Sequence, residues 1–373
     1  MVSNNSRYVF SQGKWRLFTC LLVVLTCVAH GASVQELYSD EVPVLSHDDA
    51  GRQQAMKIAL EKVLVRVTGK EAVTDHPEIK KAMAEPAPYI SGFSYHRKAS
   101  EDGIEQQWLK ISFDKISVDR LLTAAENAIW GASRPETMIL LAISKDNERH
   151  IIHSGSTSPV VSSVHSYFHE LSMPVFFPLM DVEDTRNISI ADVWGLFGYQ
   201  LMQSASRYKS DTVLAGRLYQ KNGLYSGELS LFFRNQRYNA PPINNLDSAG
   251  LAKVAASLTG EVLSSYYAVA STATAEKQVI VIEGIQSLKS YAGMVGYLEK
   301  LNGISDVNVQ SVIGDRVIVG VDFPGSLKKL EDAIALGKKL KLKTYPSGVD
   351  SVSSIPENAL FPDKRLYYRW VGR

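Results

Sequence analysis

Three acidic residues stand close together near the middle of the chain, at Asp181, Glu183 and Asp184. They follow a predicted strand at 175–179, and α/β folds place ligands beyond the carboxyl ends of their strands. Carboxylates in that position could bind a cation or perform acid–base catalysis, as in a divergent hydrolase. The same acids also precede a predicted helix, whose N-terminus is stabilised by negative charge without any ligand. We favour this second interpretation and keep the hydrolase as the alternative.

Four histidines lie in one short stretch, at His150, His153, His165 and His169. His165 and His169 are spaced to lie one turn apart on one face of a helix, which would suit two zinc ligands. Serine-rich residues separate this pair from His150 and His153, and the helix lacks the second histidine of the metalloprotease motif. We therefore expect solvated histidines and no cofactor. A hydrolase with a metal cluster of these histidines is part of the same alternative.

A helix predicted at 189–208 carries three further candidates, Trp194, Arg207 and Tyr208. Arg207 and Tyr208 at its C-terminal end could bind an anionic group, although a cation is favourable at a helix C-terminus without any ligand. Val193, Leu196, Phe197 and Leu201 form the inward stripe of this helix. Trp194 lies beside that stripe, so we expect it in the core rather than as a stacking platform. The chain has no Walker loop, no Gly-x-Gly-x-x-Gly and no Gly-x-Ser-x-Gly motif.

The chain ends in an aromatic-basic patch at 366–370, which includes Tyr368 and Trp370. This patch could contact lipid headgroups at a membrane surface or a partner peptide. It could equally add a strand to the edge of a sheet. The sequence leaves both interpretations open.

The N-terminus has the pattern of a secretory signal peptide. Arg7, Lys14 and Arg16 precede an apolar run at 17–29, and small residues follow. Because the run is shorter than the roughly 20 residues of a membrane span, we expect cleavage after Gly31 and a periplasmic protein. A lipoprotein or an uncleaved anchor is a weaker alternative. Both cysteines lie within residues 1–31, so the mature chain would have no disulfide and no thiolate metal site.

The charge balance argues against nucleic acid as a partner. The chain has 40 basic and 39 acidic side chains, which leaves no global positive field. We expect another protein of the cell envelope as the partner, and the oligomeric state stays open.

The helical and strand patterns predict a multi-domain α+β and α/β fold. An N-terminal α+β domain at 32–134 has helices at 49–68 and 76–84 and strands at 90–97 and 106–113. A layered α/β domain at 135–269 has a strand at 138–143, a helix at 160–171 and a hairpin at 212–233 around Asn222-Gly223. A loop is expected at 239–247, before a helix at 249–266. A small polar linker at 270–277 leads to a βαββαβ domain at 278–345, read as ferredoxin-like, and a tail at 346–373.

Several short motifs resemble a known bacterial family. They are Arg66-Val67-Thr68-Gly69, Trp130-Gly131-x-x-Arg134-Pro135, Asp192-Val193-Trp194-Gly195 and Ala205-Ser206-Arg207-Tyr208. They are similar to the domain-of-unknown-function family "DUF twenty-sixty-six", found in the envelopes of Gammaproteobacteria. The family carries no established activity, so the resemblance implies an exported bacterial protein and little more. Arg134 is expected to anchor a domain-boundary loop through a carboxylate pair.

The middle domain is also similar to the anticodon-binding-type modules of Tol and curli-secretion envelope proteins. Those modules serve binding and assembly, so the resemblance implies binding rather than catalysis. The sequence therefore predicts an exported, non-catalytic binding or accessory protein of the Gram-negative cell envelope.

Overall fold

The computed structural model describes residues 37–44, 48–99, 105–270, 276–301, 303–304, 306–343 and 365–372. The predicted signal peptide, most of the predicted linker and most of the tail lie outside these residues. Across them the fold is mixed α+β, with ten α-helices and three β-sheets, which confirms the expected fold class. None of the described helices is both long and apolar enough to cross a membrane.

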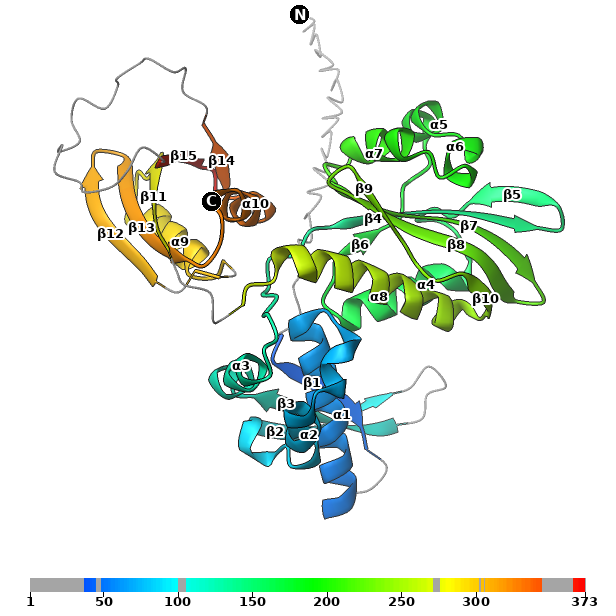
Figure 1. Ribbon diagram of the computed structural model, residues 1–373, viewed down its shortest axis with the longest axis horizontal. Helices are drawn as coiled ribbons and strands as arrows, with labels where there is room; N and C mark the ends of the chain where they lie inside the picture. The colour runs from blue at the N-terminus through cyan, green and yellow to red at the C-terminus, as the bar shows by residue number, and fades with distance from the viewer. Residues whose placement is uncertain are drawn as a thin grey trace, which may run out of the picture. The chain divides into compact units, whose positions relative to one another are not determined.

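The N-terminal part packs helix α1 (Asp49–Thr68) against an antiparallel sheet of β1 (Ser39–Pro43), β3 (Glu105–Phe113) and β2 (Ile90–Ala99), as Figure 1 shows. The Asp48 side chain caps the start of α1, and Gly69 ends it at φ 71°. Both ends are where the sequence predicts them, because a short acidic cap and a left-handed glycine are strong local signals. Helices α2 (Pro77–Ala84) and α3 (Lys115–Ala124) complete this part.

The middle part is a mixed sheet covered by helices on both faces. Strand β4 (Thr137–Lys145) pairs in parallel with β7 (Thr212–Lys221), which forms a hairpin with β8 (Leu224–Phe233) through Asn222-Gly223. Helices α4 (Pro159–Glu170) and α8 (Ser248–Tyr267) cover one face, and the short helices α5 to α7 cover the other (Figure 1). Alternate residues of β4 therefore enter two separate cores, which explains its uninterrupted apolar run.

One predicted helix of the middle part is wrong. The segment expected as a single helix at 189–208 forms α6 (Ile190–Trp194) and α7 (Gly198–Ser206), after a separate α5 (Val182–Asn187). The chain breaks at Leu196, whose φ of 52° is left-handed although its side chain is buried. Because of this break Phe197, expected in the core, is 51% exposed.

Four strands of the middle sheet are short. The predicted strand at 175–179 is reduced to β6 (Val175–Phe176), and the sequence analysis missed β5 (Glu148–Ile151), β9 (Gln236–Asn239) and β10 (Ile243–Leu246). Strands β9 and β10 take up most of the segment expected as a loop at 239–247 and the residues before it. Strands of two to four residues give too few alternations for a pattern to be read from sequence.

The C-terminal part has the predicted βαββαβ order. It contains β11 (Glu276–Glu283), α9 (Leu288–Leu298), β12 (Asp306–Ile313), β13 (Arg316–Phe323), α10 (Leu327–Leu336) and β14 (Leu340–Leu342). The alternation on β13 is confirmed, since Val317, Val319, Val321 and Phe323 all enter the core that both helices cover. Helices α9 and α10 begin at their predicted caps, Ser287 and Ser326.

The end of the tail forms a strand, which is one of the two structures expected for it, but the strand does not lie at a sheet edge. Residues Arg365–Trp370 form β15, which lies between β11 and β14, parallel to β11 and antiparallel to β14. The strand is therefore inside the sheet and not at its edge. Tyr368 and Trp370 are 2% and 8% exposed, so the prediction of a surface patch that touches lipid or a partner is wrong for these two side chains. They alternate with Tyr367 and Arg369 and belong to the core.

Candidate functional site

The fold joins the predicted acids to the predicted cation, which lie far apart in the sequence. Asp181 caps α5, and its Oδ1 accepts the N–H groups of Glu183 and Asp184, each at 3.0 Å. Arg207, at the end of α7, donates to Asp181 Oδ1 at 2.6 Å and to Asp181 Oδ2 at 2.7 Å. Two parallel bonds of this kind between a guanidinium and a carboxylate are the strong, directional form of an ion pair.

Asp184 extends the same network into the protein. Its side chain is 4% exposed, and its Oδ1 accepts from Arg207 Nη1 at 2.7 Å. Its Oδ2 accepts from the hydroxyl of Tyr208 at 2.5 Å and from the backbone N–H of Met180 at 2.9 Å. The Tyr208 hydroxyl in turn accepts the N–H of Leu179 at 3.1 Å. All four carboxylate oxygens of the two aspartates are therefore hydrogen-bonded, and the network ties α5 to the end of α7.

The electrostatics of this network do not suit acid–base catalysis. Hydrogen bonds from Arg207 hold the pKa of Asp181 well below its usual range, with support from the backbone N–H of Asp184. Burial, and then the hydrogen bond to Asp184, raise the pKa of Tyr208. A general base works best with a pKa near the working pH, and both shifts lead away from it. The arrangement fits a structural brace at the start of a short helix.

Trp194 lies at the margin of a core and reaches the surface. Its ring meets Tyr219 edge to face at 5.2 Å, and the guanidinium of Arg149 stacks over it at 4.1 Å. Trp194 is half-buried against the core that α5 to α7 cover, while Tyr219 is 56% exposed. The same helices carry Phe197 and Tyr199, of which Tyr199 is 77% exposed. The sequence analysis missed the exposure of Phe197, because the break in the predicted helix turns its side chain outward.

The four histidines lie in different surroundings. Over the described ranges of the chain, no group of three or more His, Cys, Asp or Glu side chains could hold a metal ion. The His165 ring packs against Phe177 at 5.5 Å, and burial lowers its pKa. His153 Nδ1 accepts the N–H of Gly155 at 3.2 Å. His150 and His169 are exposed, on β5 and in the last turn of α4.

Two buried arginines form a second network that the sequence analysis underestimated. Arg66 is 1% exposed, forms an ion pair with Asp40, and donates to the carbonyls of Ser39 and Glu170, each at 2.6 Å. Arg66 lies within the apolar stripe of α1, and a charged residue at such a position was the sequence signal for a buried, paired arginine. These bonds connect α1 to β1 and to the end of α4.

Arg134 binds carbonyls, so its expected carboxylate pair is wrong. Its guanidinium donates to the backbone oxygens of four residues, Arg66, Trp130, Gly131 and Leu171. It also stacks over the Trp130 ring at 4.1 Å. Burial, together with the charge of Arg66, lowers the pKa of Arg134 to about 9. A planar cation with five N–H groups can donate to several buried carbonyls at once. An arginine paired with a carboxylate would leave those carbonyls without its hydrogen bonds.

Comparison with known proteins gives one match. Residues 31–131 match a family model described as "Domain of unknown function (DUF8605)". This N-terminal part of the chain therefore carries a domain of unknown function, and the family differs from the one that the short motifs resemble. Searches of curated proteins and of solved structures find no match.

Proposed function

We propose that this protein is an exported, periplasmic binding or accessory protein of the Gram-negative cell envelope, with no catalytic activity of its own. The observation that supports this most is a set of four aromatic side chains in the middle part, of which Phe197, Tyr199 and Tyr219 are exposed, and Trp194 is half-buried against Tyr219. Tyrosine, tryptophan and arginine are enriched where proteins bind one another. We refer to these four residues below as the aromatic surface.

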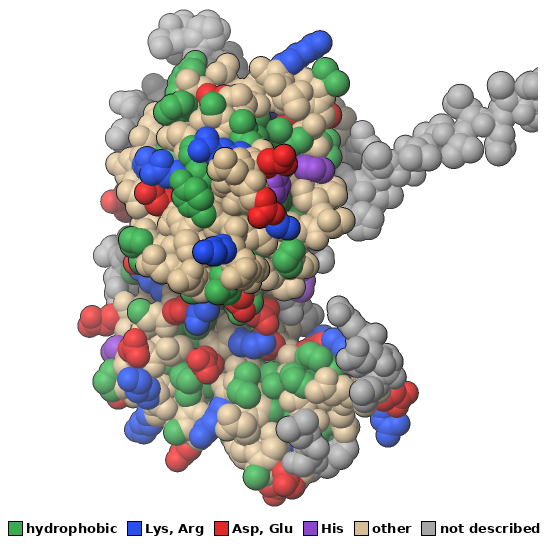
Figure 2. Space-filling view, turned by 90° about the vertical axis from the view of Figure 1, so that its right-hand side faces the viewer, with side chains coloured by type: hydrophobic (Ala, Val, Ile, Leu, Met, Phe, Trp, Pro, Cys, Tyr) green, Lys and Arg blue, Asp and Glu red, His purple; other side chains and the backbone are tan. Residues whose placement is uncertain are grey.

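Contacts with neighbouring side chains fix the position of Trp194 and of helix α6, which carries it. Trp194 is held between Arg149 and Tyr219, and α6 is stabilised by a capping box between Ser189 and Asp192. Figure 2 shows hydrophobic side chains in small groups beside Lys and Arg on the upper part of the face that it presents. Rigid aromatic groups lose little side-chain entropy on binding, which favours a protein partner.

The candidate catalytic residues support binding over hydrolysis. Asp181 and Asp184 accept hydrogen bonds from Arg207 and Tyr208 on oxygens that a catalytic pair would need.

Export is supported by the first 31 residues, in which cations come first, an apolar run follows and small residues come last. When cells are fractionated, the protein should be found in the periplasmic fraction, and N-terminal sequencing should show that it begins at Ala32. Full-length protein retained in the inner membrane would contradict export.

Cross-linking in intact envelopes tests the binding role. A Tyr199→Ala and Tyr219→Ala double variant should lose most of the cross-linked complex seen with the wild type, because it removes two exposed rings and little core packing. Ile116→Ala is the matched control, since Ile116 is 67% exposed on α3 and away from the aromatic surface. Equal cross-linking by the double variant and the control would refute the role of the aromatic surface.

A further inference from the structure

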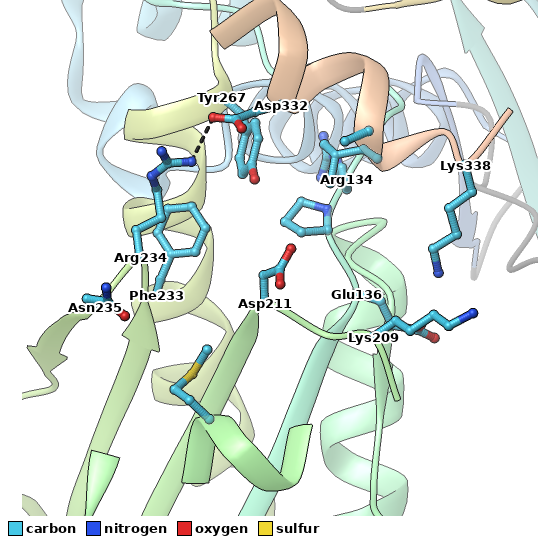
Figure 3. A pocket seen from close by; sticks show the side chains of 14 residues that line it. Arg134, Glu136, Lys209, Asp211, Phe233, Arg234, Asn235, Tyr267, Asp332 and Lys338 are labelled. Carbon is cyan, nitrogen blue, oxygen red and sulfur yellow. Dashed lines mark hydrogen bonds and ion pairs between the residues drawn. The ribbon is translucent and has the colours of Figure 1, made fainter. Parts of the chain in front are cut away.

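A cavity of about 340 Å³ lies at one end of the middle sheet. Its lining includes Glu136 and Asp211, which directly precede β4 and β7, and Phe233, which ends β8. Lys209 and Lys338 also line it, and Lys338 follows α10 of the C-terminal part (Figure 3). Cavities of this size commonly hold small ligands, and they occur preferentially between parts of a chain.

One charged pair on the wall of this cavity is already satisfied. Arg234 Nη1 donates to Asp332 Oδ2 at 2.7 Å, and the Tyr266 hydroxyl donates to the same oxygen at 2.5 Å. Lys328 adds a further contact to Asp332 at 3.3 Å. These groups hold α10 against the end of β8 and need no ligand.

Four other charged side chains of the lining are exposed to solvent and are not paired with protein groups in this way. The side chains of Lys209, Lys338, Glu136 and Asp211 form no hydrogen bond or ion pair with any other residue that the structure describes. Two are cations and two are anions, although they line the same cavity. Unpaired charges of both signs in one concavity suit a ligand that itself carries both signs.

The arrangement of these groups gives the orientation of such a ligand. In Figure 3 the ammonium groups of Lys209 and Lys338 lie on the same side of the cavity, and the Asp211 carboxylate lies nearer its middle. Two neighbouring ammonium groups repel each other until an anion lies between them. Tyr267, which is half-buried, supplies aromatic surface on the opposite wall, and Phe233, which packs against it, is 2% exposed.

We propose that this cavity binds a small zwitterion of the amino-acid or dipeptide class. The ligand carboxylate lies between Lys209 and Lys338, its ammonium group faces Asp211, and its apolar side chain packs against Tyr267. The site is separate from the aromatic surface, so this proposal goes beyond the binding role proposed above and can fail independently of it.

Calorimetric titration of the full mature protein tests the site. The probes are L-phenylalanine, L-alanyl-L-phenylalanine, and the dipeptide capped either as an N-acetyl or as a C-terminal amide, each at up to about 5 mM. At least one of the two zwitterions should bind, and their comparison separates amino acid from dipeptide. Each cap should weaken binding at least about tenfold, because it removes a charge-assisted hydrogen bond.

Variants then assign the two ends of the ligand. The Lys209→Ala and Lys338→Ala double variant should weaken binding of the zwitterion at least about tenfold and leave the amide-capped dipeptide unchanged, which identifies the carboxylate contact. Asp211→Asn should weaken binding of the dipeptide with a free amino group and leave binding of the N-acetylated dipeptide unchanged, which identifies the ammonium contact. Lys221→Ala, an exposed lysine at the end of β7, is the control, and circular dichroism checks that each variant is folded.

Three outcomes would overturn the proposal: no heat of binding from either zwitterion at the highest concentration, equal binding of a capped and the free dipeptide, or equal binding by the lysine double variant and by Lys221→Ala. If the acetylated dipeptide is the one that binds equally, the cavity is a simple anion site. None of these results would bear on the cross-linking test of the aromatic surface, so the two proposals can be judged separately.

Discussion

Replacing Arg66 by methionine should destabilise the protein strongly, because the substitution leaves charged and polar groups buried without a partner. The Arg66 and Asp40 side chains are 1% and 6% exposed. Arg66→Met keeps most of the apolar volume but removes the ion pair with Asp40 and two hydrogen bonds to the carbonyls of Ser39 and Glu170. Breaking one side of a buried pair costs about 3–5 kcal/mol, much of it from the uncompensated charge that remains.

Urea unfolding of the mature protein measures this loss. The chain has several cores, so tryptophan fluorescence and far-ultraviolet circular dichroism should be followed together to see whether the transitions coincide. Arg217→Met is the matched control, because the Arg217–Glu228 pair has side chains 39% and 47% exposed and should contribute less than about 1 kcal/mol.

A second substitution separates the charge from the packing. The double variant Arg66→Met and Asp40→Leu removes both partners, so it should lose less stability than Arg66→Met alone. A loss below about 1 kcal/mol for Arg66→Met would refute the argument, since a surface pair would then explain the result equally well. A double variant less stable than the single one would show that packing, and not the stranded Asp40, decides the effect.

Three further predictions follow from the other contacts. The pKa of Asp181 is lower in the folded than in the unfolded protein, so the stabilisation is present above the unfolded value of about 4 and is lost as the pH falls through the folded value. Arg207→Gln should reduce this acid-side slope in melting temperatures measured against pH, and an unchanged slope would contradict the pairing. Trp370→Ala should cost about 3–5 kcal/mol in chemical unfolding, whereas the 39% exposed Val371→Ala should cost little, and equal losses would contradict the core position of β15. Dialysed protein should carry well under one zinc per chain by elemental analysis, and zinc that His165→Ala removes would contradict the absence of a metal site from the described residues.

Local signals predicted much of the fold. The cap at Asp48, the left-handed Gly69 and the Asn222-Gly223 turn each act within a few residues, and each marks the element boundary that the sequence assigns. The alternation on β13 was equally readable, because a strand with one face in a core repeats every two residues.

The errors arise where distant packing decides the structure. Leu196 adopts a left-handed conformation and its side chain enters a core, although the flanking Gly195 and Gly198 were a local signal for a break in the helix. The pairing of β15 with β11 joins residues that are far apart in the chain, so sequence pattern could not show that the strand lies inside the sheet. A period of two was nevertheless present, since Leu366, Tyr368 and Trp370 alternate with Tyr367 and Arg369.

The candidate site shows the same division between residue type and partner. Asp181, Asp184, Arg207 and Tyr208 could all be chosen from the sequence, but their mutual contacts depend on how α5 meets α7. Arg134 was expected to find a carboxylate and instead donates to four backbone carbonyls, which the fold and not the sequence brings around it.

The contrast between two clusters of charge in the middle part indicates where a ligand would bind. At Asp181 and Asp184 the acids are matched by Arg207 and by N–H groups, so a ligand there would have to displace strong hydrogen bonds. In the cavity beside β4 and β7, the exposed side chains of Lys209 and Asp211 have no such partners among the described residues, so a ligand would displace only water from them. Saturated charges stabilise the fold and unsaturated ones remain available for binding, so the cavity and not the acidic cluster is where substitutions should change affinity while leaving stability nearly unaltered.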